Sequence, residues 1–264
     1  MTRVAAIIPA RFASTRFPGK PLILIRGKPM ILHVAERVAL ARSAGVVDRL
    51  IVATDDERIQ KVVENAGYEC RMTSREHPTG TDRLAEVART LDDYDVVCNV
   101  QGDEPLIDVA TLAALVQPLR DHPDVSMATL KTELDRPEDR FDPNRGKVVV
   151  DARDRALTFT RLPIVDDVPA GKSYFNRELV EREHKQRGLH VWSDIGVYAY
   201  RRPFLLEYAV MTQTPFEKAE RLEQLRALEH GHQIAVPTVH HRGFEVDTPE
   251  DLARVEAALA REGL

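Results

Sequence analysis

Apolar residues along the chain occur in two alternating patterns. Short β-branched runs at residues 4–8, 49–53, 96–100 and 125–130 predict strands, and apolar positions with helical spacing at 30–42, 57–66, 83–91 and 109–120 predict helices. Strands that alternate with helices are typical of βαβ units, in which the strands are parallel. The pattern therefore predicts an α/β fold with a mostly parallel central sheet.

This alternation stops in the second half of the chain. Residues 146–150, 156–160 and 195–200 have strand patterns without long helices between them, so we expect a mixed, strand-rich subregion around 146–200. Within it, the charged segment 166–187, with a possible helix at 177–185, is predicted to be a mobile excursion that proteases cut first.

The last third of the chain returns to the first pattern. We predict a helix at 215–229, a strand at 233–236 and a final helix begun by the capping sequence Asp247-Thr248-Pro249-Glu250. The 264 residues suffice for one large α/β domain, and we expect a single domain over 1–264.

Composition narrows the class of protein. Hydrophobic residues make up 43% and charged residues 30%, which is typical of a soluble globular protein, and the sequence contains no apolar run near the ~20 residues that span a bilayer. We expect a cytoplasmic protein without membrane insertion. The net charge of −5 argues against a nucleic-acid partner. The two cysteines, Cys70 and Cys98, are expected to be reduced and mostly buried thiols.

A basic loop follows the first predicted strand. It carries Arg11, Arg16 and Lys20 and is bracketed by Pro9 and by Pro18-Gly19. These cations therefore lie at the carboxyl end of a parallel strand, where open α/β sheets bind ligands. Together they suit a polyanion such as a triphosphate. The loop is not a Walker A motif, and no Gly-x-Gly-x-x-Gly fingerprint follows a strand. A solvated basic loop without a ligand is the alternative.

Carboxylates are predicted at the same edge of the sheet. The strand in "VCNVQGDEP" leads directly into Asp103, and Asp247 stands between a short strand and the last helix. Carboxylates beside phosphates repel unless a cation separates them, and Mg²⁺ takes one or two carboxylates together with phosphate oxygens. Asp103 and Asp247 are therefore candidate Mg²⁺ ligands. Asp247 could instead serve only as a helix N-cap.

The segments "IIPARFASTRFPGKPL", "HPTGTDRLAEV", "NVQGDEPLI", "PFEKAERLEQLRAL" and "GFEVDTPEDL", in this order over nearly the whole chain, resemble the 3-deoxy-manno-octulosonate cytidylyltransferases, also called CMP-Kdo synthetases. The resemblance implies a Rossmann-like nucleotidyltransferase fold with a small strand-rich dimerisation region and a homodimer. It also implies a Mg²⁺-dependent reaction of CTP with the sugar acid 3-deoxy-manno-octulosonate (Kdo), which gives CMP-Kdo and pyrophosphate for lipopolysaccharide biosynthesis.

The resemblance also implies roles for individual residues. Arg11, Lys20 and Asp103 would be catalytic, and the nucleotide would contact Arg11, Arg16, Lys20, His77 and Gly80. The sugar acid would be surrounded by Arg83, Gln101, Arg161, Asp194, Tyr198, Glu223 and Gln224. Ordinary surface positions are the alternative for Arg83 and Arg161, and a solvated helix face is the alternative for Glu223 and Gln224.

Two departures from the family pattern fall on the sugar side. Asp194 stands where the family usually has a histidine, and the segment beginning Thr160-Arg161 differs from the usual Ser-Arg-Ala-x-Ile-Pro-Trp. An ionised Asp194 would favour an acceptor that presents hydroxyl donors or an ammonium group, unless a cation such as Arg161 or Lys172 pairs with it. A modified, for instance 8-amino, octulosonate is therefore an alternative acceptor. A sugar phosphate, and a binding protein that has lost catalysis, are further alternatives.

Overall fold

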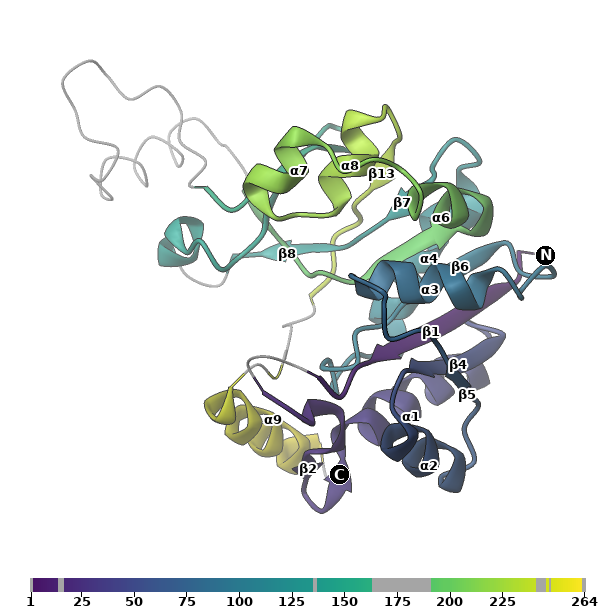
Figure 1. The fold of residues 1–264 in the computed structure, drawn as a ribbon. Helices are drawn as coiled ribbons and strands as arrows, with labels where there is room; N and C mark the ends of the chain where they lie inside the picture. The colour runs from purple at the N-terminus through teal and green to yellow at the C-terminus, as the bar shows by residue number, and fades with distance from the viewer. Residues whose placement is uncertain are drawn as a thin grey trace. The chain divides into compact units, whose positions relative to one another are not determined.

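The computed structural model describes residues 2–13, 17–134, 137–162, 191–240, 246 and 248–262. The chain forms two compact units (Figure 1). Unit 1 comprises Met1–Ala128, Val197–Met211 and His241–Leu264, and unit 2 comprises Thr129–Gly196 and Thr212–His240.

The strands of unit 1 form a mostly parallel sheet, as the sequence predicts. Its order is β7 (Met127–Ala128), β12 (Tyr198–Arg201), β6 (Val96–Asn99), β1 (Val4–Ala10), β4 (Arg49–Thr54) and β5 (Cys70–Met72). β1 is parallel to both of its neighbours, with Ala5 opposite Arg49 and Val97. β12 is antiparallel to β6 and to β7. The apolar run at the start of β1 is fully buried, which explains why its sequence is continuously apolar rather than alternating.

The helices of unit 1 follow the strands in the βαβ manner. They are α1 (Met30–Ser43), α2 (Glu57–Asn65), α3 (Gly80–Ala88), α4 (Val109–Asp121), α6 (Arg202–Tyr208) and α9 (Pro249–Glu262). α1 packs against α4, and α3 packs against α6. α3 begins three residues earlier than predicted because Thr79 and Asp82 form a capping box: each side chain accepts from the other's backbone N–H.

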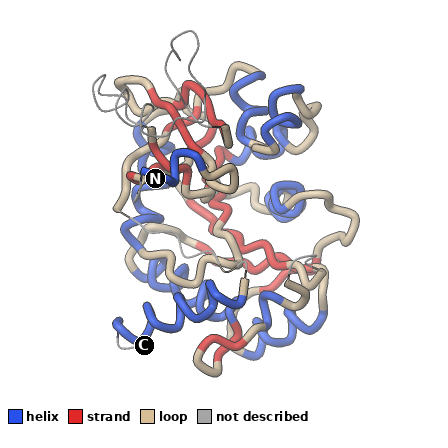
Figure 2. Tube along the Cα trace, turned by 90° about the vertical axis from the view of Figure 1, so that its left-hand side faces the viewer, coloured by secondary structure: helices blue, strands red, loops and turns tan. Residues whose placement is uncertain are grey.

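The last helix closes a small apolar cluster in unit 1. α9 packs against the hairpin of β2 (Leu24–Ile25) and β3 (Lys28–Pro29), as Figure 1 shows, and leads to the C-terminus (Figure 2). The cluster joins Ile25 and Met30 to Val255 and Leu259 of the helix. Thr248 caps α9, since its side chain accepts from Asp251 N at 3.3 Å. The predicted alternative N-cap, Asp247, lies outside the described residues.

Unit 2 contains an antiparallel sheet in the order β10 (Ala156–Thr160), β9 (Lys147–Val150), β11 (Trp192–Asp194) and β8 (Lys131–Glu133). The short helices α7 (Pro215–Glu220) and α8 (Gln224–Glu229) and the strand β13 (Ile234–Ala235) belong to the same unit, and 3₁₀ turns lie at Lys20–Leu22 in unit 1 and Pro137–Phe141 in unit 2. The predicted strands 146–150 and 156–160 are thus confirmed. The predicted excursion 166–187 and its possible helix lie outside the described residues.

Three predicted elements are longer in the sequence prediction than in the structure. The predicted strand 195–200 begins too early, because Gly196 (φ 77°) separates β11 from β12. The predicted helix 215–229 is two helices, because Arg221 takes a left-handed conformation (φ 55°) that ends α7. The predicted strand 125–130 is only the short β7, and β8 follows it in another sheet.

Two further expectations concern thiols and membranes. Cys98 is buried and Cys70 partly buried, and both are free, as predicted; burial raises the pKa of the Cys98 thiol to about 12. No helix among the described residues has the length and apolar character needed to cross a bilayer.

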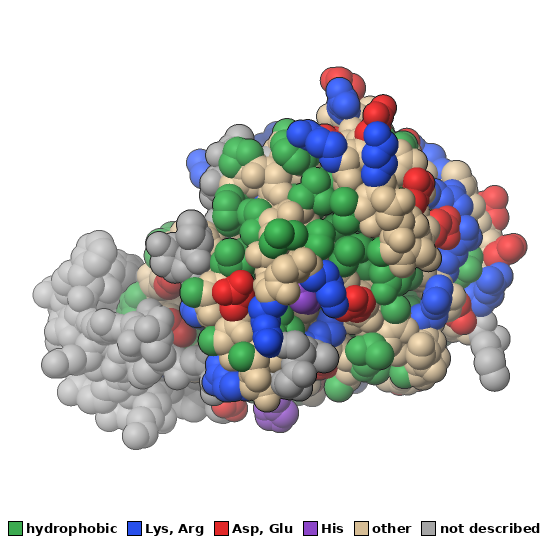
Figure 3. All heavy atoms as spheres, turned by 90° about the horizontal axis from the view of Figure 1, so that it is seen from below, with side chains coloured by type: hydrophobic (Ala, Val, Ile, Leu, Met, Phe, Trp, Pro, Cys, Tyr) green, Lys and Arg blue, Asp and Glu red, His purple; other side chains and the backbone are tan. Residues whose placement is uncertain are grey.

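On the face drawn in Figure 3, apolar side chains occupy the middle and charges of both signs lie mainly around them.

Candidate active site

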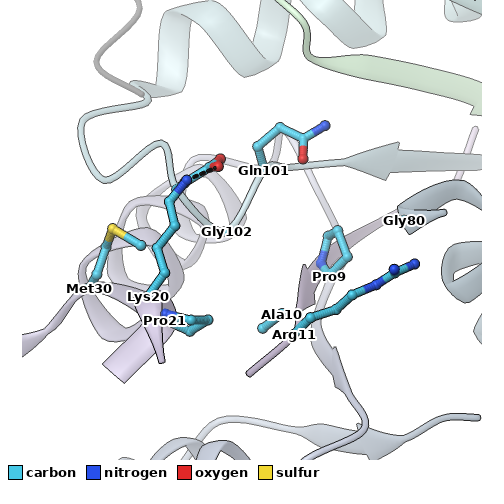
Figure 4. A pocket seen from close by; sticks show the side chains of 10 residues that line it. Pro9, Ala10, Arg11, Lys20, Pro21, Met30, Gly80, Gln101 and Gly102 are labelled. Carbon is cyan, nitrogen blue, oxygen red and sulfur yellow. Dashed lines mark hydrogen bonds and ion pairs between the residues drawn. The ribbon is translucent and has the colours of Figure 1, made fainter. Parts of the chain in front are cut away.

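A cavity of about 250 Å³ lies at the carboxyl ends of β1 and β6 in unit 1 (Figure 4). It brings together residues that are far apart in sequence because β1 and β6 are neighbours in the sheet. Its lining consists of Pro9, Ala10, Arg11, Lys20, Pro21, Met30, Gly80, Gln101, Gly102 and Asp103. Five predicted site residues, Arg11, Lys20, Gly80, Gln101 and Asp103, therefore line one cavity.

Lys20 and Asp103 form an ion pair at this cavity, with 2.7 Å between Lys20 Nζ and Asp103 Oδ2. The Lys20 side chain is 11% exposed and that of Asp103 is 30% exposed, so the carboxylate remains accessible while the ammonium is largely enclosed. The 3₁₀ turn that carries Lys20 is preceded by Gly19, whose φ of 72° suits glycine. A phosphate entering here would meet a cation that the carboxylate already holds in place.

Arg11 extends from the end of β1 towards the segment that precedes α3 (Figure 4). Its Nη1 donates to Pro78 O at 3.2 Å. His77, one residue before, hydrogen-bonds to Glu86 of α3 through Nε2, and Glu86 also accepts from Ser74 N. Arg11 thus links the basic loop to the 77–80 segment that we predicted to bind the nucleotide. Arg16 lies outside the described residues.

Gly102 is a site residue that sequence reasoning missed. A Cβ atom placed there would lie 2.8 Å from Pro9 O of the backbone, closer than real Cβ atoms approach. Any side chain would therefore push the loop after β6 away from β1. Gly80 differs, because a Cβ there would meet only the Pro9 side chain, at 3.7 Å. The signal for Gly102 was its position directly before Asp103 at a strand end.

Asp103 is the described carboxylate at this cavity that could take part in binding a divalent cation. Asp103 offers a partly exposed carboxylate, and its backbone O accepts from Val246 N at 3.1 Å, which ties the residue before Asp247 to Asp103. Asp247 itself lies outside the described residues. Among the residues that are described, no group of three or more His, Cys, Asp or Glu could hold a metal. Such a cation would therefore need oxygens from the bound nucleotide, as Mg²⁺ commonly does.

Arg83, predicted to contact the sugar acid, is fully buried in α3. Its Nη2 bonds to Asp55 Oδ2 at 2.9 Å, and its Nη1 donates to Thr73 Oγ1. Buried charges are costly unless they are paired, and these partners at the ends of β4 and β5 compensate the guanidinium. The structure thus shows Arg83 as a buried, paired residue of unit 1; contact with the sugar acid stays a prediction.

A second group of predicted residues lies in unit 2, around Asp194 at the end of β11. Asp194 Oδ1 accepts from Thr129 Oγ1 at 3.0 Å and from Gly196 N at 3.3 Å, and Oδ2 accepts from Gln224 Nε2 at 2.8 Å. Two of these donors, Thr129 and Gln224, are almost fully buried. Arg161, one of the two cations considered as possible partners of Asp194, donates from its guanidinium to Asn144 O and Pro143 O instead; the other, Lys172, lies outside the described residues.

Arg161 is held at the end of β10 by two buried charges. Glu220 accepts from Arg161 N at 2.8 Å through one oxygen and from Thr160 Oγ1 at 3.0 Å through the other. Lys147 Nζ donates to Arg161 O at 3.0 Å and also to Asp142 O and Arg145 O. Burial lowers the pKa of Lys147. Sequence reasoning missed Glu220 and Lys147, because neither stands at the carboxyl end of a parallel strand or in a ligand-like spacing.

The remaining predicted residues are Tyr198 and Glu223. Tyr198 begins β12 beside Asn99 of β6, and the centroid of its ring lies 6.4 Å from the ring centroid of Tyr200. Glu223 precedes α8, directly before Gln224. Both occupy the segments in which we predicted sugar contacts, and their roles stay predictions.

Comparisons with known proteins show the family of the chain. The family model described as cytidylyltransferase matches residues 5–234. The 3-deoxy-manno-octulosonate cytidylyltransferase of Pelobacter propionicus is 48% identical over 95% of both chains, and that of Geobacter sulfurreducens is 48% identical over 96% of this chain and 97% of its own.

Solved structures extend the likeness to the fold. A CMP:2-keto-3-deoxy-manno-octonic acid synthetase complexed with CTP superposes with a TM-score of 0.86, at 38% identity over 99% of this chain and 100% of the other. A 4-diphosphocytidyl-2C-methyl-D-erythritol synthase from Anaerococcus prevotii shares the fold at a TM-score of 0.62 and 14% identity, over 98% of this chain and 99% of the other. By sequence and fold, the chain belongs to the cytidylyltransferase family and, within it, to the 3-deoxy-manno-octulosonate cytidylyltransferases.

Proposed function

We propose that this protein transfers the cytidylyl group of CTP to 3-deoxy-manno-octulosonate and releases pyrophosphate. The observation that carries the proposal is the cavity at the ends of β1 and β6, where Arg11, Lys20 and Asp103 converge in a chain of this family. Two cations suit the phosphates of CTP, and a carboxylate beside them suits a bridging divalent cation. We propose Mg²⁺ in that role.

In this mechanism the anomeric hydroxyl oxygen of the sugar acid attacks the α-phosphorus of CTP in line. The new bond joins this oxygen to the α-phosphorus, and the bond from the α-phosphorus to the oxygen that bridges to the β-phosphorus breaks. Pyrophosphate leaves with that electron pair, and the hydroxyl proton passes to water. Lys20 and Arg11 stabilise negative charge on the phosphates, and Asp103 orients Lys20 through the 2.7 Å contact. Mg²⁺ held by Asp103 and Asp247 would neutralise phosphate charge and make the sugar hydroxyl more acidic.

The contacts of the sugar acid are proposed from the family resemblance. We propose that the guanidinium of Arg161 binds its carboxylate and that Gln101, Tyr198, Glu223 and Gln224 contact its hydroxyls. Arg83, which is paired with Asp55, would also contact the sugar acid. We further propose that the protein acts in the cytoplasm as a homodimer, as the family resemblance implies; light scattering after size-exclusion chromatography measures the second point.

The test is pyrophosphate release from purified protein with CTP, Mg²⁺ and 3-deoxy-manno-octulosonate. We expect release that depends on both substrates and stops with EDTA. Asp103→Ala should lower kcat by on the order of 10³-fold, because it removes both the cation's carboxylate and the partner of Lys20. Release without the sugar acid, or undiminished release in EDTA or in the variant, would contradict the proposal.

A further inference from the structure

The contact between Asp194 and Gln224 has a defined direction. Gly196 N–H can only donate, so the Asp194 oxygen that it reaches must accept. Gln224 approaches the other carboxylate oxygen with its NH₂ group, at 2.8 Å. A carboxylate that accepts from Thr129, Gly196 and Gln224 is stabilised in its ionised form, and an ionised carboxylate accepts from Gln224 Nε2 but repels Oε1.

This direction determines which end of the Gln224 amide is left for a ligand. Gln224 is 2% exposed, so its orientation is fixed by its surroundings rather than averaged by solvent. Its Nε2 is bound to Asp194, and among the described residues no group donates to its Oε1. An amide held by its nitrogen in this way presents its oxygen as the acceptor for a ligand.

We propose that Asp194 is a positioning residue: it holds Nε2 of Gln224, so that Oε1 is presented as the acceptor for a hydroxyl group of the sugar acid. This inference rests on the proposed function, since the sugar acid is the ligand. It deepens that function by assigning a role to Asp194.

Direct recognition of the acceptor by the charge of Asp194 is the competing explanation. An ammonium-bearing sugar would be favoured if the carboxylate were exposed to it without other donors. Here Thr129, Gly196 and Gln224 already donate to its two oxygens, so the charge is compensated within unit 2.

Variants that exchange the donor and the acceptor in the hydrogen bond between Gln224 and Asp194 test the proposal. In Asp194→Asn, Oδ1 can still accept from Gly196, which places the NH₂ group opposite Gln224 and forces its amide to turn, so that a donor replaces the acceptor. We expect KM for 3-deoxy-manno-octulosonate to rise about tenfold or more and KM for CTP to stay within about twofold. Gln224→Glu places two carboxylates in contact and should raise the same KM.

The double variant Asp194→Asn with Gln224→Glu reverses the bond: the new asparagine donates to the new glutamate, whose other oxygen is again an acceptor. We expect at least fivefold recovery of the sugar-acid KM relative to Asp194→Asn, which a merely structural role would not give. Asp154→Asn is the matched control, because Asp154 lies in the same unit and pairs with Lys131 at 2.6 Å; its sugar-acid KM should stay within about twofold. A double variant no better than the worse single variant would overturn the proposal.

A second readout does not need activity. Nitrogen-15 NMR of glutamine-labelled protein follows the Gln224 side-chain amide, whose protons should exchange slowly in the wild type and faster in Asp194→Asn. Both single variants should lower Tm, and the double variant should recover it. If the wild type transfers no cytidylyl group, the proposed function fails while these measurements still decide the pairing. Equal exchange in wild type and Asp194→Asn, or additive losses of Tm, would overturn it.

Discussion

The two units hold their candidate site residues by different means. In unit 1 the residues come from loops that follow parallel strands, and strand order together with the close approach of Gly102 to Pro9 brings them to one cavity. In unit 2 buried side-chain hydrogen bonds hold Asp194 and Arg161, through partners such as Gln224 and Glu220. A site of the first kind depends on backbone packing, and a site of the second kind depends on polar complementarity.

This difference predicts the largest effect at Gly102. Gly102→Ala places a Cβ 2.8 Å from Pro9 O, and because backbone atoms must move, we expect kcat/KM to fall about 100-fold. Gly80→Ala is the matched comparison, since its Cβ meets only Pro9 Cγ at 3.7 Å; we expect a change below about threefold. Coupled pyrophosphate kinetics measure both. Equal effects of the two substitutions would show that backbone approach does not place this site.

A substitution in unit 2 that removes a polar contact should have a smaller effect on kinetics than Gly102→Ala. Glu220→Met keeps a side chain of similar length but removes both acceptor oxygens, which face Arg161 N and Thr160 Oγ1. We expect KM for the sugar acid to rise about tenfold, because Arg161 loses a fixed position, while KM for CTP changes by less than about threefold. Steady-state kinetics with each substrate varied in turn measure this. An increase confined to CTP would contradict the assignment of Arg161.

The smallest effect is a pH dependence of stability from Lys147. Burial lowers the pKa of Lys147 below its ordinary value of 10.5. Between the lowered pKa and 10.5 the unfolded chain binds a proton that the folded protein has lost, so this group makes the free energy of unfolding increase with pH in that window. Lys147→Met removes the contribution. Urea unfolding at several alkaline pH values should give a less positive slope for the variant; identical slopes would contradict the burial effect.

The sequence predicted the first kind of site better than the second. The order of strands and helices in unit 1 follows from hydrophobic periodicity, and Arg11, Lys20 and Asp103 could be assigned to one edge because strand ends meet there. The hydrogen bonds of Asp194 join residues 65 and 30 positions away, Thr129 and Gln224, and no periodicity encodes such pairs. For the same reason the sequence left open which cation, if any, pairs with Asp194.

Local backbone conformation limited the rest of the prediction. The break at Arg221 separates α7 from α8 although the apolar spacing continues across it, and a left-handed arginine has no sequence signal comparable to a glycine. The burial of Arg83 was also missed, since its partners Asp55 and Thr73 come from the ends of β4 and β5. These features depend on tertiary contacts rather than on local sequence.

The central claim is that unit 1 binds the nucleotide while Gln224 of unit 2 reads the sugar acid, and two Michaelis constants measured in two variants test it most directly. In Lys20→Met, KM for CTP should rise at least about tenfold, with KM for 3-deoxy-manno-octulosonate within about threefold, because a cation for the phosphates is lost. In Gln224→Met the pattern should be reversed. If either variant raises both constants equally, the division of the substrates between these residues is wrong.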